Sequence, residues 1–104
     1  MASFTLHDLE QRVKARAQAS ADVSYTRRLL DQGVDQCAKK LGEEAIETIL
    51  AAIAEDRERL IAETADLIYH LLVVLAARGV ALADVEAELG KRTKQSGLEE
   101  KAGR

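Results

Sequence analysis

The chain has 104 residues, which is the length of one domain with a modest hydrophobic core. Its 15 Lys and Arg residues and 18 Asp and Glu residues give a formal net charge of −3, which argues against a nucleic-acid partner, because a phosphate-binding surface is normally basic. The one cysteine, Cys37, excludes an internal disulfide bond and fits a reducing cytoplasm, and the N-terminus lacks the pattern of a signal peptide.

The composition predicts an all-α fold, because proline is absent and Ala, Leu and Glu are frequent. Thr5, with Asp8 three residues later, predicts a capped start of the first helix. Ser24 predicts the start of a short second helix over about Tyr25–Gln32. Gly33 is predicted to end that helix.

Two long helices and a shorter one are predicted in the rest of the chain, at about 34–54, 58–78 and 82–96. Residues 67–77 are apolar on nearly every side, so we expect this part of the fourth helix to be buried, partly against a second subunit. The run is too short to span a membrane, and extending it backwards meets acidic residues. We therefore expect one domain over residues 1–104, an antiparallel helical bundle of about five helices completed by homodimerisation. The polar tail 97–104 is expected to be ordered only if something holds it.

Two clusters of acidic residues fall on the long helices: Glu43, Glu44 and Glu47, then Glu63 and Asp66. At about 100° per residue, the first cluster spans an arc of about 100°, and the second cluster shares an arc of about 60° with His70. If the two helices pack antiparallel, both acidic faces can meet. Carboxylates that converge in this way repel each other unless a cation intervenes, and oxygen ligands favour Mg²⁺. The pattern therefore predicts a magnesium site suited to phosphate chemistry.

Neighbouring residues admit both a functional and an ordinary interpretation. Lys39 and Lys40 precede the acids by one turn and could meet phosphate oxygens, but they could equally be surface lysines. His70 could support the acids, although a lone histidine on an apolar helix is usually a core residue. The first acidic cluster, taken alone, could be a solvated helix face. The presence of both clusters at matched i, i+3 spacing favours a site.

These segments resemble a known family. The sequences Lys39-Lys-Leu-Gly-Glu-Glu-Ala-x-Glu47 and Glu63-Thr-Ala-Asp-Leu-Ile-Tyr-His-Leu-Leu72 are similar to those of the phosphoribosyl-ATP pyrophosphatases of histidine biosynthesis, within the all-α (MazG-like) NTP pyrophosphatases. The likeness covers about residues 24–104. The resemblance implies hydrolysis of 1-(5-phosphoribosyl)-ATP to phosphoribosyl-AMP and pyrophosphate by a homodimer. The chain lacks the cyclohydrolase domain often fused to this family, so we expect a monofunctional enzyme.

The resemblance also implies roles for individual residues. The implied Mg²⁺ ligands are Glu44, Glu47, Glu63 and Asp66. Glu43 would be an extra ligand or would hold the attacking water, and either Glu43 or Glu44 would be the catalytic proton acceptor. Lys39, Lys40 and Arg92 are the candidates for substrate binding, while Arg27, Arg28 and Lys94 stay open. His70 would support the ligands without binding the metal.

Two rival hypotheses remain at this stage. The same metal site could serve a house-cleaning (d)NTP pyrophosphohydrolase. Alternatively, the chain could be a non-catalytic helical oligomerisation module whose acids confer only solubility. A di-iron carboxylate bundle fits less well, because Asp66 stands where that motif requires histidine.

Overall fold

The computed structural model describes residues 3–93, and over this range it contains five α-helices and no β-strand. The helices are α1 (Leu6–Ala17), α2 (Tyr25–Asp31), α3 (Val34–Ala54), α4 (Arg57–Ala77) and α5 (Leu82–Arg92). The predicted all-α fold is therefore confirmed. The bounds of α3 match the prediction, and those of α4 differ by one residue. Helix α5 ends at Arg92, before the predicted end near residue 96, and the predicted tail lies outside the described residues.

The residues predicted to begin the first two helices and to end the second do so through the expected caps. The Thr5 side chain accepts a hydrogen bond from the Asp8 backbone N–H, and the Asp8 carboxylate accepts one from Thr5, which completes a capping box. Ser24 caps α2, and its hydroxyl also donates to the Arg16 carbonyl at 2.8 Å, which ties the end of α1 to the start of α2. Gly33 and Gly79 adopt positive φ angles of 96° and 68°, which glycine accepts without strain.

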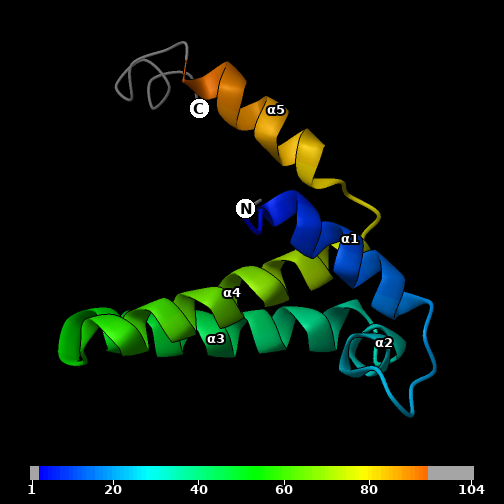
Figure 1. Cartoon of the computed structure of the whole chain (residues 1–104), viewed down its shortest axis with the longest axis horizontal. Coiled ribbons are helices and arrows are strands. Elements are labelled where there is room, and N and C mark those ends of the chain that lie inside the picture. Colours follow the sequence, from blue (N-terminus) through cyan, green and yellow to red (C-terminus); the bar gives the residue numbers. More distant parts are fainter. Residues whose placement is uncertain (1–2, 94–104) are drawn as a thin grey trace.

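Helices α3 and α4 form a long antiparallel hairpin, which is the main body in Figure 1. Asp56 caps the start of α4 by accepting from the Arg59 N–H at 2.8 Å, so the connection between the helices is very short. Helix α1 crosses α4 near its C-terminal end, and α2 lies beside the same end of the hairpin (Figure 1). Helix α5 extends away from the hairpin (Figure 1).

The buried core gathers where these helices meet. Its members are Val13, Leu29, Cys37, Leu72, Val73 and Leu82, and every helix contributes at least one of them. Burial raises the pKa of the Cys37 thiol, so this free cysteine packs in the core as a small hydrophobic side chain. The core therefore anchors one end of the hairpin, while the other end projects beyond it (Figure 1).

The projecting part of the hairpin leaves apolar side chains uncovered within one chain. In this part Ile49, Ile53 and Ile61 are 55%, 78% and 52% exposed, and nearer the core Leu71 is 42% exposed. The expectation that 67–77 is buried on nearly every side therefore holds for Leu72 and Val73 but is wrong for Leu71. The reason is that α1 and α2 cover only one end and one side of α4.

Helix α4 is long and apolar enough, by length and composition alone, to cross a membrane. Only residues 67–77 were considered from the sequence, and these are too few to span a membrane, whereas the continuous helix has 21 residues. This is a weak indication, because the core helix of a water-soluble protein passes the same test. Glu63 and Asp66 lie within α4, and charged side chains at such depth in a lipid bilayer are costly.

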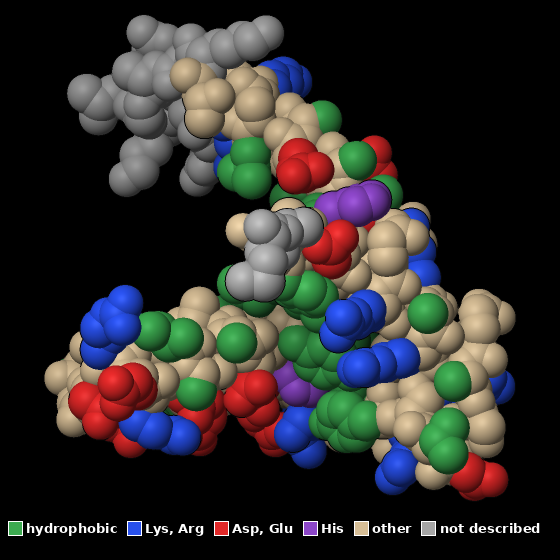
Figure 2. Space-filling view, viewed as in Figure 1, with side chains coloured by type: hydrophobic (Ala, Val, Ile, Leu, Met, Phe, Trp, Pro, Cys, Tyr) green, Lys and Arg blue, Asp and Glu red, His purple; other side chains and the backbone are tan. Residues whose placement is uncertain are grey.

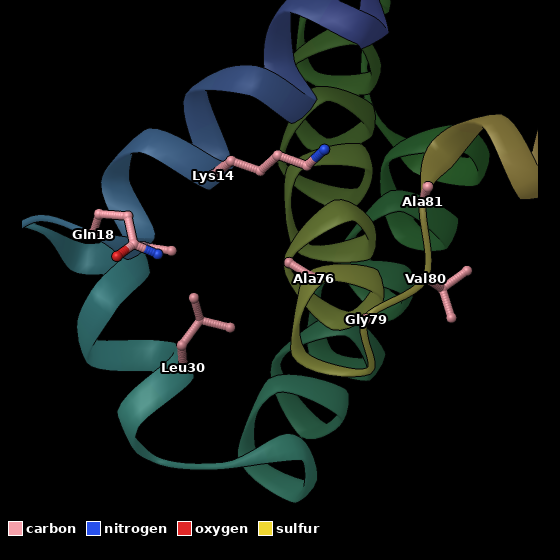
Figure 3. A pocket seen from close by; sticks show the side chains of 8 residues that line it. Lys14, Gln18, Leu30, Ala76, Gly79, Val80 and Ala81 are labelled. Carbon is pink, nitrogen blue, oxygen red and sulfur yellow. The ribbon is translucent and has the colours of Figure 1, made fainter.

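Two hollows are lined by residues other than the acidic clusters of α3 and α4. One, of about 330 Å³, is lined by Lys14, Gln18, Leu30, Ala76 and the 79–81 loop, so it lies between α1, α2 and the end of α4 (Figure 3). The other, of about 380 Å³, is formed by Val80 and one face of α5. Neither was predicted from the sequence, and the first is made by segments that meet only in the folded chain.

A matched pair of substitutions tests the position of the core. Val13 is 2% exposed and Val23 is 81% exposed. We expect Val13→Ala to lower the free energy of unfolding by about 1–3 kcal/mol, because a fully buried valine leaves an unfilled space. Val23→Ala should change it by less than about 0.5 kcal/mol. Urea denaturation followed by circular dichroism measures both, and equal effects would contradict this description of the core.

Candidate metal centre

Three carboxylates from two helices converge at the seam of the α3–α4 hairpin. One oxygen each from Glu44, Glu63 and Asp66 lies within 4.8 Å of the other two. Glu63 and Asp66 are one turn apart on α4, and Glu44 reaches them from α3. The predicted meeting of the two acidic faces is therefore confirmed for these three residues.

The seam is held closed by small and polar side chains of α3. Ala51 is 1% exposed, so the two helices approach closely at this point. The Thr48 hydroxyl lies 2.9 Å from the Glu44 carbonyl oxygen and 3.1 Å from the Glu63 carbonyl oxygen. Because the second contact joins the helices beside the acids, it fixes which residues of α3 and α4 face each other.

The three carboxylates differ in their exposure to solvent. Glu63 is buried at 7% exposure, Glu44 is half-buried and Asp66 is exposed. The two acids on α4 therefore differ in solvent access although they lie one turn apart. The site is a half-open crevice, with a dry side at Glu63 and a wet side at Asp66.

Glu63 meets a positive charge from its own helix. The Arg59 Nη2 atom donates to Glu63 Oε1 at 2.5 Å, and Arg59 Nε lies 3.9 Å from Glu55 Oε1. A buried carboxylate requires such a partner, because transfer of an unpaired charge from water is costly. Arg59 therefore neutralises the most buried acid of the crevice.

Glu44 faces a buried histidine. His70 is 6% exposed, and its Nε2 atom lies 4.0 Å from Glu44 Oε1. Burial lowers the pKa of His70, and Lys40 acts in the same direction against the raising effect of Glu44. The imidazole is therefore neutral at pH 7. Its Nδ1 atom is buried and has no hydrogen-bond partner among the described residues.

Two tyrosines enclose this histidine. The Tyr69 ring centroid lies 4.9 Å from that of His70, and the Tyr25 centroid lies 6.2 Å from it, both edge to face. The Tyr69 hydroxyl is 2.5 Å from Thr26 Oγ1, which gives this part-buried hydroxyl a hydrogen-bond partner. Tyr25 is 49% exposed and forms the outer wall of the cluster. The aromatic contacts therefore hold the ring of His70 beside Glu44.

The other predicted site residues of α3 lie at the edge of the crevice. Glu43 is exposed, and its Oε1 lies 3.2 Å from Lys40 Nζ. This hydrogen bond raises the pKa of Lys40. Glu47 and Lys39 are exposed, and Glu47 is not among the three converging acids. Figure 2 shows acidic and basic side chains gathered along this edge of the hairpin.

The predicted substrate residue Arg92 lies on a different part of the molecule. It belongs to α5, which extends away from the hairpin (Figure 1), and its Nε donates to Glu88 Oε2 at 3.0 Å. Within one chain, Arg92 is therefore not brought to the acids. It could reach an acidic crevice only on another subunit or after movement of α5.

Sequence reasoning missed two residues of the site. Arg59 falls within the predicted fourth helix and was given no role, although its spacing of four residues from both Glu55 and Glu63 is that of helical ion pairs. Thr48 was likewise given no role. Its bridge to Glu63 depends on the register between two helices, for which the sequence gives no direct signal.

The donor set fits a hard divalent cation. All three converging groups are carboxylates, and Mg²⁺ prefers oxygen ligands while keeping several waters in its shell. One oxygen from each acid lies within 4.8 Å of the other two, so the three side chains would be able to hold one such ion together. The exposed Asp66 leaves one side of the crevice open to water and substrate.

The sequence matches a known protein family and several of its members over nearly its whole length. Residues 6–93 match the sequence model of the family described as phosphoribosyl-ATP pyrophosphohydrolase. The chain is 62% identical to phosphoribosyl-ATP pyrophosphatase 1 of Bradyrhizobium diazoefficiens, over 100% of this chain and 98% of that protein. It is 63% identical to phosphoribosyl-ATP pyrophosphatase of Azorhizobium caulinodans, over 96% and 92% respectively. It is 58% identical to phosphoribosyl-ATP pyrophosphatase 1 of Rhodopseudomonas palustris, over 100% and 97%.

Proposed function

The chain belongs to the phosphoribosyl-ATP pyrophosphohydrolase family, and we propose that it hydrolyses 1-(5-phosphoribosyl)-ATP to phosphoribosyl-AMP and pyrophosphate with Mg²⁺ in histidine biosynthesis. The observation that carries the proposal is the convergence of Glu44, Glu63 and Asp66 at the hairpin seam. Such a group of acids repels a polyphosphate by itself. It can bind a polyphosphate only when a cation lies between the carboxylates and the phosphates.

The proposed metal ligands are Glu44, Glu63 and Asp66, with Glu47 added from the next turn of α3. Mg²⁺, when bound, would neutralise charge on the triphosphate as the leaving pyrophosphate develops it. Glu43 is the proposed acceptor of the proton from the attacking water, because it is exposed at the open side of the crevice. Glu44 remains the alternative acceptor. His70, which is buried with its Nε2 atom 4.0 Å from Glu44 Oε1, is proposed to support the Glu44 carboxylate without binding the metal.

Basic residues beside the crevice would bind the outer phosphates. Lys40 already meets Glu43 at 3.2 Å, which places its ammonium group at the edge of the acids. Lys39 precedes it on the same helix. We propose that Arg92 contributes from the partner subunit, because α5 extends away from the acids of its own chain (Figure 1).

We also propose that residues 1–104 form one catalytic domain that works in the cytoplasm as a homodimer. The support is the apolar surface of the hairpin, defined by Ile46, Ile49, Leu50, Ile53 and Ile61, whose side chains are all more than half exposed. A continuous apolar surface of this kind on a water-soluble protein is typical of a subunit interface. Self-association would bury it and complete the helical bundle.

The first test removes single metal ligands. We expect Glu63→Gln and Asp66→Asn each to lower kcat/KM for phosphoribosyl-ATP by at least about 100-fold, because each removes a charge from the metal site. Glu58→Gln, an equal change at an exposed position of the same helix, should stay within about twofold. Pyrophosphate release from phosphoribosyl-ATP, measured with Mg²⁺ and with EDTA, gives both values.

Two outcomes of this assay would contradict the proposal. If the folded wild-type chain releases no pyrophosphate while a positive control does, the activity is absent, and the oligomerisation-module hypothesis gains support. If a panel of (d)NTPs is turned over faster than phosphoribosyl-ATP, the metal site stands but the substrate is that of a house-cleaning enzyme.

The second test concerns the subunit interface. We expect Ile53→Glu to weaken self-association by at least tenfold, about 1.4 kcal/mol, because it places a charge in a buried apolar contact. Val23→Glu introduces the same group at an 81% exposed site outside the apolar surface and should have no effect. Sedimentation equilibrium over a range of protein concentrations measures the dimer dissociation constant. A monomeric wild-type chain would refute the interface.

A further inference from the structure

Arg59 is the cation that meets the acidic crevice in the protein alone. Its guanidinium lies 2.5 Å from Glu63 Oε1, and the Glu63 side chain is only 10% exposed. The Arg59 side chain itself is 53% exposed. The ion pair therefore joins a buried carboxylate to a half-exposed cation.

This ion pair conflicts with the proposed role of Glu63. A divalent cation at the three acids would bind the Glu63 carboxylate, whose Oε1 atom Arg59 now contacts. Two positive centres within a few ångströms of each other repel strongly where solvent is partly excluded. The guanidinium and the metal ion therefore compete for Glu63.

The structure provides a second partner for Arg59. Glu55 lies four residues before Arg59, as Glu63 lies four residues after it, so the three form an i, i+4 ladder across the start of α4. Arg59 Nε is already 3.9 Å from Glu55 Oε1, and Glu55 is exposed. A rotation of the long Arg59 side chain would transfer its charge from Glu63 to Glu55 without any movement of the backbone.

We propose that Arg59 is a positioning residue, which pairs with Glu63 while no metal is bound. When a metal ion binds Glu63, the Arg59 side chain moves to pair with Glu55 instead. The inference rests on the proposed metal site. Arg59 keeps the buried carboxylate charged and in place while no metal is bound, and it weakens metal binding by competition. The affinity of the site for its metal is thus set by a residue that is not a ligand.

The experiment measures metal binding without substrate, using Mn²⁺ followed by electron paramagnetic resonance and Mg²⁺ followed by calorimetry. We expect Arg59→Met to lower the dissociation constant for both ions by about tenfold, because the competitor is gone. The metal-free variant should melt about 5 °C lower than the metal-free wild type, because Glu63 loses its partner. Saturating Mg²⁺ should remove most of this difference.

Matched variants separate competition from a general change in charge. Arg57→Met removes the same charge from an exposed position on the same turn of α4, and should change the dissociation constant by less than about twofold. Glu55→Gln should weaken metal binding more than Glu58→Gln does, because Arg59 then has no second partner. In the Arg59→Met background, these two glutamate changes should have equal effects.

Arg59→Lys covers the case in which Arg59→Met does not fold, because it keeps the charge but loses the planar guanidinium and should bind the metal two- to fivefold more tightly. If the wild type binds Mn²⁺ and the Arg59 variants bind it with equal or lower affinity, the inference is overturned. A raised KM for phosphoribosyl-ATP with unchanged metal affinity would also overturn it, because Arg59 would then be a substrate ligand. If the wild type binds no metal, the proposed metal site itself fails.

Discussion

The register between α3 and α4 is the constraint on which the site depends. A shift of one residue along either helix would turn its side chains by about 100° and separate the three acids. Three features hold the register: the Asp56 cap, which makes the connection short, the buried Ala51, which lets the helices approach, and the Thr48 hydroxyl, which contacts the Glu63 carbonyl. All three lie within α3 and the start of α4, so the hairpin itself determines which carboxylates meet.

The acids are tolerated because each has a way of relieving its charge. Glu63 is buried and meets Arg59, Asp66 is exposed to water, and Glu44 is only half-buried, so that water still reaches it. The hairpin can therefore fold with its crevice already formed and without a metal ion. This matters for catalysis, because a preformed set of ligands does not have to be ordered when metal and substrate bind.

The sequence predicted the local features of this fold well, because they depend on neighbours along the chain. The capping box at Thr5, the cap at Ser24, the glycine stops and the long α3 all follow from residues within one turn of each other. The convergence of the acids was predicted from helical periodicity together with one assumption, antiparallel packing. Features that depend on the packing of distant segments were not predicted, such as the exposure of Asp66 and the position of α5. The contact between Arg59 and Glu63 was missed for another reason: helical spacing allows many ion pairs, and the sequence does not show which carboxylate will be buried.

The residues that stabilise the hairpin and the residues of the proposed metal site lie in different parts of it. The core packs at the end where α1 and α2 cover α4, whereas the acids lie along the seam beyond it and the isoleucines of α3 point to solvent. A hairpin stabilised at only one end would open most easily at its free end, where few buried contacts hold it. The proposed dimer would supply the missing contacts on the apolar face and leave the acidic edge open to substrate. In such an assembly the metal site gains rigidity from the partner subunit, although its three converging ligands all come from one chain.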